Sequence, residues 1–172
     1  MRLPPLLLFI VSLLCAGCSL LPDQIDETKG WSAQQLYSAS REALSEGNYQ
    51  TAIGYLDKIQ ARYPFGRYAQ QAQLDTIYAQ YRDGEPDAAL AAADRFIKAN
   101  PRHPYVDYAY YMKGLINFQR SNTLFDRLAP ADRSKTDTNS ARQSYNDFSE
   151  LVQKFPKSKY AADARQRIVF LH

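Results

Sequence analysis

One pattern recurs three times along this chain and restricts its fold more than any other feature. A glycine stands 17 positions before a proline at Gly47 and Pro64, and again at Gly84 and Pro101. Glycine permits the positive φ that a tight turn needs, and proline ends a helix because it has no N–H to donate. A third copy ends at Pro156. Each copy therefore predicts two helices that are joined by a tight turn and closed by a proline.

The residues around each turn support this prediction. In the first copy, apolar residues follow the spacing of an amphipathic helix, at Tyr49, Ala52, Ile53, Leu56 and Ile59. Ala52 falls where the two helices would cross, and Ala89 and Ser144 take its place in the other copies. Asn139 takes the turn position of the third copy. A tyrosine follows each proline by four positions and an alanine by eight, at Tyr68, Tyr105, Tyr160, Ala72, Ala109 and Ala164.

A helix–turn–helix unit of about 34 residues is typical of tetratricopeptide (TPR) repeats. The predicted fold class is therefore all-α, an α-solenoid of TPR helix pairs that is C-terminally incomplete. We expect helices at 32–46, 49–62, 67–82, 86–99, 104–119 and 140–154, with the start of another from residue 160. The TPR domain would cover 32–172, with repeats at about 32–66, 67–103, 104–158 and 159–172.

The third repeat is longer than the others. Its prolines are 55 residues apart instead of 37, which places an insertion of about 18 residues near 120–138. Insertions in repeat proteins map to loops that often contact partners. We therefore consider Phe125, Asp132 and Arg133 as contact residues of this loop, with a short helix that folds back on the solenoid as the alternative. The apolar run 168–171 is unlike a polar terminal cap, so we expect either further repeats in a longer protein or a partner in their place.

The first 31 residues differ from the rest. Arg2 precedes an apolar run from Leu6 to Leu14, which is too short to span a bilayer and suits a secretory signal. The segment Leu14-Cys15-Ala16-Gly17-Cys18 resembles a bacterial lipobox, so residues 1–17 are interpreted as a lipoprotein signal peptide and Cys18 as the lipidation site. Residues 18–31 would be the lipidated N-terminus and a tether. The alternative is an ordinary signal peptide with incidental cysteines.

The chain offers little for catalysis or for cofactors. It holds two histidines, and neither has cysteine or carboxylate neighbours at metal-ligand spacing. The acidic residues of the insertion lack the spacing of a calcium loop. A formal charge of +3 without a run of Lys and Arg does not indicate nucleic-acid binding. We therefore predict no enzyme activity, no metal and no cofactor apart from the covalent lipid on Cys18.

The groove of the array is the expected binding surface, because the first helix of each TPR pair lines it. The TPR register places there Gln34, Tyr37, Arg41, Gln71, Leu74, Tyr78, Tyr81, Arg82, Tyr108, Tyr111, Leu115 and Phe118. Tyrosine offers a large contact area and a hydroxyl group at small entropic cost. The groove would thus suit an extended peptide with aromatic side chains and a carboxylate end. The alternative is that these tyrosines serve ordinary packing between repeats.

Several phrases of the sequence closely resemble the BamD family, which is also called ComL or YfiO. They are Arg62-Tyr63-Pro64-Phe65-Gly66, Gln71-x-Gln73-Leu74-Asp75, Asp94-Arg95-Phe96-Ile97, Asp132-Arg133-Ser134, Asp147-Phe148-Ser149 and Arg167-x-Val169-Phe170-Leu171. The family consists of TPR lipoproteins of the outer-membrane β-barrel assembly (BAM) machinery.

The resemblance implies a non-enzymatic scaffold that is lipid-anchored in the outer membrane and faces the periplasm. Its implied partners are a BamA-type barrel protein with its POTRA domains, other BAM lipoproteins, and the C-terminal strands of unfolded outer-membrane proteins. Family members usually carry about five repeats, and the later ones hold much of the BamA contact. A periplasmic TPR adaptor for cell-envelope synthesis or division is the competing hypothesis, and an enzyme domain beyond residue 172 is a third.

Overall fold

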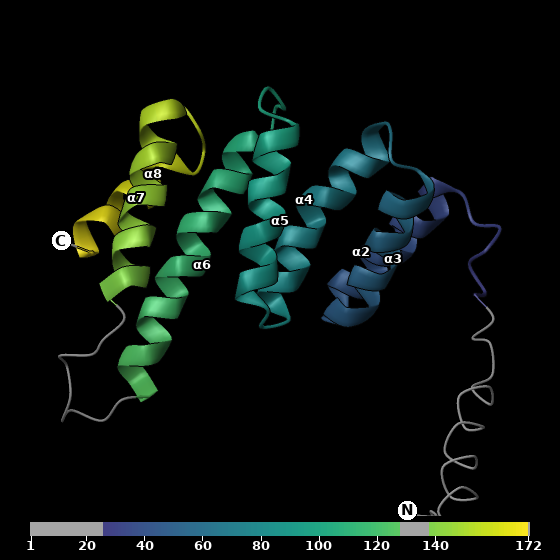
Figure 1. Cartoon of the computed structure of the whole chain (residues 1–172), viewed down its shortest axis with the longest axis horizontal. Helices are drawn as coiled ribbons and strands as arrows, with labels where there is room; N and C mark the ends of the chain where they lie inside the picture. Colours follow the sequence, from purple (N-terminus) through teal and green to yellow (C-terminus); the bar gives the residue numbers. More distant parts are fainter. Residues whose placement is uncertain (1–25, 128–137, 172) are drawn as a thin grey trace, which may run out of the picture. The chain divides into compact units, whose positions relative to one another are not determined.

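The computed structural model describes residues 26–127 and 138–171 as an array of antiparallel helices (Figure 1). The helices are α2 (Ala33–Ser45), α3 (Tyr49–Arg62), α4 (Arg67–Arg82), α5 (Pro86–Ala99), α6 (Val106–Arg127), α7 (Thr138–Lys154) and α8 (Ala161–Phe170). Within these described ranges there is no strand. The fold is thus the all-α arrangement of TPR-like helix pairs that the repeated pattern predicts, with α2, α4 and α6 as first helices and α3, α5 and α7 as second helices.

The turns inside the repeats are fixed by glycine. Gly47 and Gly84 have φ values of 76° and 82°, a region in which a side chain is strained. At the first turn the Gly47 N–H donates to the carbonyl of Leu44, and the Asn48 N–H donates to the carbonyl of Ala43. This is the Schellman arrangement that ends α2. The Asn48 side chain then accepts from the N–H of Thr51 and so begins α3.

Small residues allow the paired helices to approach each other. Ala52 and Ala89 are completely buried at the positions expected for helix crossings. In the third pair, the hydroxyl of Ser144 donates to the carbonyl of Gly114 at 2.9 Å. A Cβ atom on Gly114 would lie 2.5 Å from the ring of Phe148. The α6–α7 contact therefore requires glycine on one helix and a small hydroxyl residue on the other.

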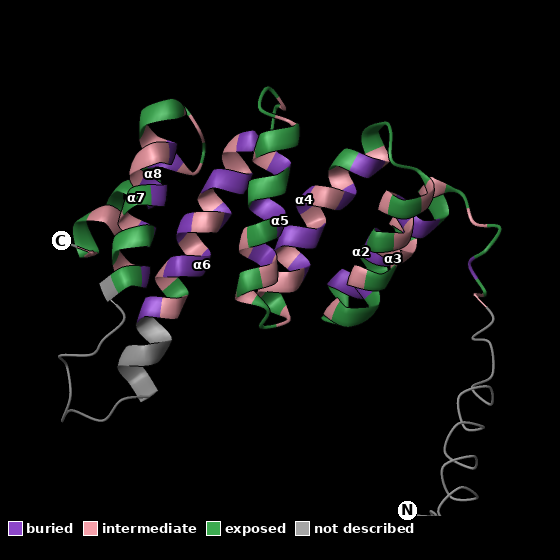
Figure 2. Cartoon of the chain, in the orientation of Figure 1, coloured by how far each residue is buried: buried purple, intermediate pink, exposed green. Residues whose placement is uncertain are grey.

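Buried residues recur along each helix of the array (Figure 2). They form two hydrophobic clusters, one around Leu36, Leu56 and Ile59 in the first helices and one around Phe96, Ile116 and Phe148 in the later ones. A polar contact adds to the second cluster. The Lys113 ammonium on α6 lies 2.8 Å from a carboxylate oxygen of Asp94 on α5 and 3.6 Å from one of Asp147 on α7. It thus ties three successive helices together.

The three turns between repeats lie at one edge of the helical array, at the top of Figure 1. The turns contact earlier parts of the chain in a repeated manner. The Tyr63 hydroxyl donates to the Trp31 carbonyl at 2.7 Å, the Asn100 side chain donates to Gln73 at 3.0 Å, and the Ser158 hydroxyl donates to Asp107 at 2.6 Å. Each turn is therefore fixed against the first half of the preceding first helix or the residues just before it.

Most helix bounds agree with the sequence expectations within two residues, but the third repeat does not. Helix α6 continues to Arg127 instead of ending near 119, so the first part of the expected insertion is helical. Helix α7 begins at Thr138, which places Asn139 in its first turn and not in the turn before it. Counting from Pro156 aligns Asn139 with Gly47, but asparagine is also favoured at a helix start, and here it lies in the first turn of α7.

Contacts divide the chain into two units, and all the helices of the described residues belong to Trp31–His172. In the other unit, the described residues 26–30 form a turn in which the Lys29 N–H donates to the Asp26 carbonyl at 3.0 Å. The structure describes no helix with the length and apolar content needed to cross a membrane.

Candidate functional site

The candidate site is the face formed by α2, α4 and α6, together with the residues of α8 and its preceding turn that pack on it. We call it the groove face. It is defined by Tyr37, Arg41, Leu74, Asp75, Tyr78, Tyr81, Arg82, Tyr108, Tyr111, Phe118, Lys159, Tyr160, Asp163 and Arg167. Its side chains form three groups along the array.

The first group centres on the carboxylate of Asp75. It accepts a hydrogen bond of 3.0 Å from the Tyr37 hydroxyl and one of 3.0 Å from the Gln71 amide, and the Arg41 guanidinium lies 3.8 Å away. Burial raises the pKa of Asp75 although all three neighbours favour the ionised form. Burial and the nearby carboxylate also raise the pKa of Tyr37 to about 12, so its hydroxyl stays protonated and can donate.

The second group places a guanidinium among tyrosines at the other end of α4. Arg82 donates to the Tyr78 hydroxyl at 2.7 Å, and its guanidinium carbon lies 5.0 Å from the ring centre of Tyr49. Arg82 is exposed. Among the residues that the structure describes, no carboxylate lies within ion-pair distance of it. Arg82 can therefore bind an incoming anion without breaking an ion pair.

The third group joins α6 to α8 through stacked rings. Tyr160 stacks on Tyr111 with ring centres 4.7 Å apart and lies 5.7 Å from Tyr108. The Tyr111 hydroxyl donates to Asp163 at 2.8 Å, and Arg167 pairs with the same carboxylate at 2.7 Å. The Arg167 hydrogen bond lowers the pKa of Asp163, while burial and Asp163 raise that of Tyr111 to about 12. Most of the polar groups of this segment are thus already paired.

A cavity of about 360 Å³ opens between the first and third groups. Its walls come from α4, from the start of α6 and from the turn before α8, and consist of Gln71, Leu74, Asp75, Tyr105, Tyr108, Lys159 and Tyr160. Binding sites for small groups are typically concave and mostly apolar with a few polar atoms. One wall of this cavity is formed by Leu74 and tyrosine rings, and its charged groups are the Asp75 carboxylate and the Lys159 ammonium. Such a cavity suits an aromatic side chain that lies next to a charged group of the ligand.

A larger cavity, of about 570 Å³, lies between α3, α4 and α5. Its lining includes Gln60, Gln73, Thr76, Arg95 and Phe96. The amide of Gln60 donates to Thr76 at 3.2 Å, and Gln73 accepts from Asn100 at 3.0 Å. Phe96 is a buried core residue. We prefer the smaller cavity as the candidate site because its aromatic rings line accessible space and its charged groups converge on it.

The structure distributes the predicted groove residues unevenly. Leu74 is only 2% exposed and belongs to the core, although it also lines the cavity. Tyr78, Tyr81, Tyr111 and Phe118 are half-buried and on the groove face, as is Tyr108. The side chain of Phe125 lies outside the described residues, as do Cys18, Asp132 and Arg133. Their expected roles therefore stay predictions.

Sequence reasoning missed five members of the groove face: Asp75, Lys159, Tyr160, Asp163 and Arg167. Asp75 lies four positions after Gln71, so helical spacing already placed it on the predicted face. Tyr160 belonged to the tyrosines that follow each proline by four residues, and Tyr68 of that set packs on Tyr37 with ring centres 5.6 Å apart. Asp163 and Arg167 had no signal of this kind, because the first turns of α8 were not assigned to the groove.

Comparison with known proteins places this arrangement in a family. A family model described as outer membrane lipoprotein, YfiO, matches residues 30–172. The chain belongs to the YfiO family. The match covers every helix that the structure describes. The resemblance seen in the sequence phrases is thereby confirmed.

Several curated relatives of this chain carry the name outer membrane protein assembly factor BamD. The relative from Neisseria meningitidis serogroup B is 43% identical over 157 residues, which are 91% of this chain and 59% of the relative. The relative from Vibrio cholerae is 38% identical over 90% of this chain and 63% of its own length. The one from Haemophilus influenzae is 32% identical over 99% of this chain and 64% of its own length. The chain thus spans about three fifths of the length of these relatives.

Proposed function

We propose that this chain is a non-enzymatic binding protein in the assembly of outer-membrane proteins. The support is its membership of the YfiO family, together with relatives named outer membrane protein assembly factor BamD. The groove-face cavity is the observation that carries the proposal for binding. Because the chain spans only part of its relatives, the activity and partners of the longer proteins are included here as proposals.

The ligand that fits the groove face is an extended peptide that ends in an aromatic residue. Leu74, Tyr108 and Tyr160 line the cavity and would contact the terminal ring. Lys159, in the same lining, would meet the terminal carboxylate. Arg82 is the second cation available to the peptide at the other end of α4. A C-terminal strand of an unfolded outer-membrane protein has this chemistry.

We place the protein at the outer membrane, anchored by lipid on Cys18 and facing the periplasm. The lipobox-like segment before Cys18 and the family's description as an outer membrane lipoprotein support this placement. A BamA-type barrel protein with its POTRA domains and other BAM lipoproteins are the proposed fellow subunits. The competing role as an adaptor for cell-envelope synthesis or division has no supporting observation in the groove face or in the relatives.

Peptide titration tests the proposal. The chain without its signal peptide is titrated with a peptide that reproduces the last strand of an outer-membrane protein and ends in Phe, and with the same peptide amidated at its C-terminus. We expect micromolar binding, and Tyr78→Ala to weaken it about tenfold, which corresponds to one good aromatic contact. Lys159→Gln should weaken binding of the free acid and leave that of the amide nearly unchanged.

Tyr55→Ala is the matched control. Tyr55 lies on α3 and stacks on Trp31 with ring centres 5.9 Å apart, away from the groove face. This variant should bind the peptide as the parent does. Equal losses in Tyr55→Ala and Tyr78→Ala would assign the effect to general destabilisation. No binding by a folded, helical chain would contradict the proposal.

A further inference from the structure

The edge that carries the turns between repeats has charged and aromatic residues beyond Tyr105 and Lys159, which also line the groove-face cavity. We call it the turn edge and define it by residues 62–67, 98–105 and 154–159. These segments contain seven Lys and Arg residues and no Asp or Glu: Arg62, Arg67, Lys98, Arg102, Lys154, Lys157 and Lys159. At the opposite edge, the turn segments 42–48 and 82–87 contain five acidic residues and one arginine. The chain as a whole holds 21 basic and 18 acidic residues, so charge is separated between the two edges.

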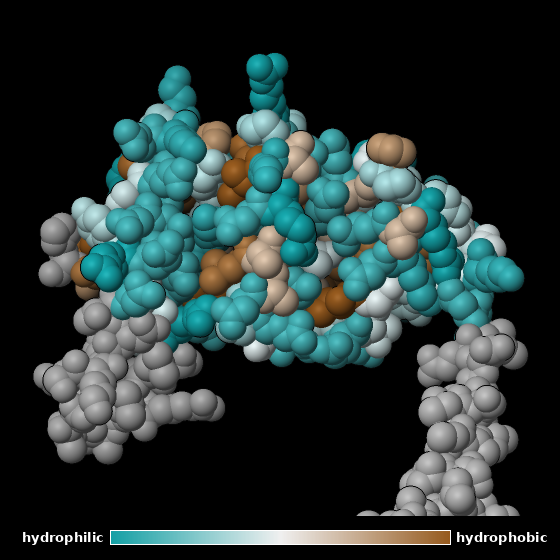
Figure 3. Space-filling model, viewed as in Figure 1, coloured by the Kyte–Doolittle hydropathy of each residue, from teal (hydrophilic) through white to brown (hydrophobic). Residues whose placement is uncertain are grey.

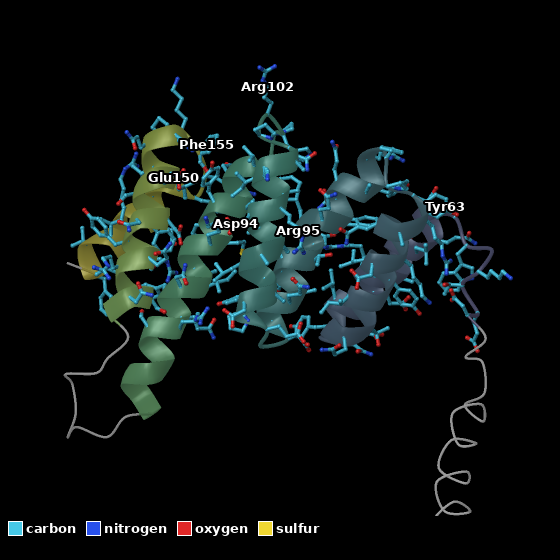
Figure 4. The ribbon with its side chains drawn as sticks, viewed as in Figure 1. Tyr63, Asp94, Arg95, Arg102, Glu150 and Phe155 are labelled. Atoms are coloured by element: carbon cyan, nitrogen blue, oxygen red, sulfur yellow. The ribbon has the colours of Figure 1, made fainter. Side chains whose placement is uncertain are left out.

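Several cations of the turn edge are exposed to solvent. Arg102 stands at the tip of the turn between α5 and α6, and hydrophilic side chains project from this turn and from the one between α7 and α8 (Figures 3 and 4). Arg67, Arg102 and Lys157 are exposed. In residues 26–127 and 138–171, neither Arg102 nor Lys157 has a carboxylate within ion-pair distance. Both charges are therefore available to an external anion.

An aromatic side chain stands among these cations. Phe65 is 90% exposed in the turn between α3 and α4, and Tyr105 is 56% exposed in the next turn. A hollow of about 630 Å³ beside Arg102 is lined by polar residues that include Gln70, Asn100 and His103. Basic side chains bind anionic head groups, and aromatic rings favour the boundary between head groups and acyl chains. The turn edge combines both.

The chain also enters the helical array at this edge. The Trp31 carbonyl accepts the hydrogen bond from Tyr63, which ends α3 next to Phe65. Cys18 lies 13 residues before Trp31, and an extended chain of that length spans at most about 45 Å. If the proposed lipid on Cys18 is present, Trp31 stays within about that distance of the membrane, and Tyr63 in the first turn contacts Trp31.

We propose that the turn edge rests on an anionic phospholipid surface, with Arg102 and Lys157 among the phosphate groups and Phe65 at the head-group boundary. A membrane fits better than an acidic protein segment because the contact points are the tips of three separate turns, whereas a peptide needs a continuous groove. The contact orients the array with the acidic turns pointing away from the bilayer. The groove residues Tyr78 and Arg82 keep their peptide partner.

Vesicle binding tests this contact apart from the lipid anchor. The chain from residue 18, with Cys18→Ser to prevent lipid attachment, is mixed with vesicles of phosphatidylcholine alone or with about a third phosphatidylglycerol, and bound protein is measured by flotation. We expect binding to the anionic vesicles only, which weakens with salt. Arg102→Glu/Lys157→Glu should weaken it at least about tenfold, because each basic residue near an anionic surface contributes several-fold. Phe65→Ser should weaken it by a smaller factor.

Arg95→Glu/Arg142→Glu is the matched control, since it changes the net charge by the same amount at exposed positions outside the turn edge. It should retain binding within about twofold. Equal losses in the two double variants, or equal binding to neutral vesicles, would overturn the proposal. So would release by millimolar inorganic phosphate at constant ionic strength, which indicates a site for the free anion, or equally tight binding of a poly-glutamate peptide, which indicates an acidic protein partner. The peptide affinity of Arg102→Glu/Lys157→Glu should match that of the parent. Failure of the membrane proposal can therefore be distinguished from failure of the peptide-binding proposal.

Discussion

At the scale of single residues, Gly114 shows how closely two helices approach. Alanine normally stabilises a helix by up to about 1 kcal/mol relative to glycine. At Gly114 the added Cβ would lie 2.5 Å from the ring of the fully buried Phe148. We expect Gly114→Ala to lower the free energy of unfolding by about 1–3 kcal/mol, because over-packing forces the ring to move. Urea denaturation of parent and variant measures the difference.

Gly54→Ala is the control for this prediction. Gly54 lies in α3, is exposed, and has no atom within 4 Å of the position that a Cβ would take. The substitution should raise the free energy of unfolding by about 0.5–1 kcal/mol. Stabilisation by both alanines would show that the α6–α7 contact is looser than described here.

Two carboxylates of the groove face, those of Asp75 and Asp163, predict opposite pH effects. The pKa of Asp75 is raised by burial, so its contribution to stability is present at low pH and is lost as the pH rises through its folded pKa. The pKa of Asp163 is lowered by Arg167, so its contribution is lost as the pH falls through its folded pKa. Between about pH 3 and pH 7, Asp75→Asn should therefore gain stability relative to the parent, and Asp163→Asn should lose it.

Thermal unfolding of the parent and both variants across this range checks the signs. Each variant is compared with the parent at the same pH, so that the other titrating groups cancel. A change of the same sign in both variants would show that the hydrogen bonds, and not the charges, decide the contributions of these residues.

At the scale of whole helices, α8 is the element held by the fewest partners that the structure describes. Its outer residues Val169 and Phe170 are 75% and 72% exposed. On the inner side, Arg167 pairs with Asp163 and lies 4.8 Å from the ring centre of Phe118. Arg167→Ala should speed amide hydrogen exchange in α8 several-fold and leave α2 to α5 unchanged, because local opening costs less than global unfolding.

Arg165→Ala provides the comparison on the same helix. Arg165 is exposed, and its guanidinium donates a hydrogen bond of 3.4 Å to the Pro156 carbonyl. Exchange in α8 of this variant should resemble that of the parent. Equal acceleration by both substitutions would mean that exchange in α8 responds to any loss of positive charge, and not to the contacts of Arg167 with Asp163 and Phe118.

The helices themselves were predictable, because local chemistry decides where they begin and end. The turn at Gly47 and the proline at position 64 mark the second helix within a residue of its observed bounds. The end of α6 was not predictable in this way. No glycine or proline lies between the expected end near residue 119 and Arg127, where the helix ends. Repeat counting failed where the sequence lacked a stop signal.

The site was predictable as a face but not as a set of contacts. Helical spacing placed Tyr37, Tyr78 and Tyr111 on one side of the array. It could not show that Tyr37 donates to Asp75 or that Tyr111 donates to Asp163, because these partners lie 38 and 52 residues apart in the chain. Contacts between repeats depend on how helices pack, and a single sequence does not encode that packing in a local signal.

At the scale of the whole molecule, two surfaces of the helical unit differ in their chemistry. The groove face holds aromatic rings, a cavity and the cations Arg82 and Lys159. The turn edge holds exposed cations and Phe65. A repeat array can present both because each helix pair contributes one first helix to the groove and one turn to the edge. The central claim is that unfolded substrate binds the groove face.

Photo-crosslinking tests that claim most directly. A photoreactive phenylalanine analogue replaces Tyr78 on the groove face or, as the matched control, Tyr55 on α3. Each variant is mixed with an outer-membrane protein that ends in Phe and is diluted from urea in its unfolded state. We expect a crosslinked product from position 78 that disappears when the substrate lacks its last strand, and none from position 55. Crosslinking from position 55 alone, or from position 78 regardless of the last strand, would contradict the account.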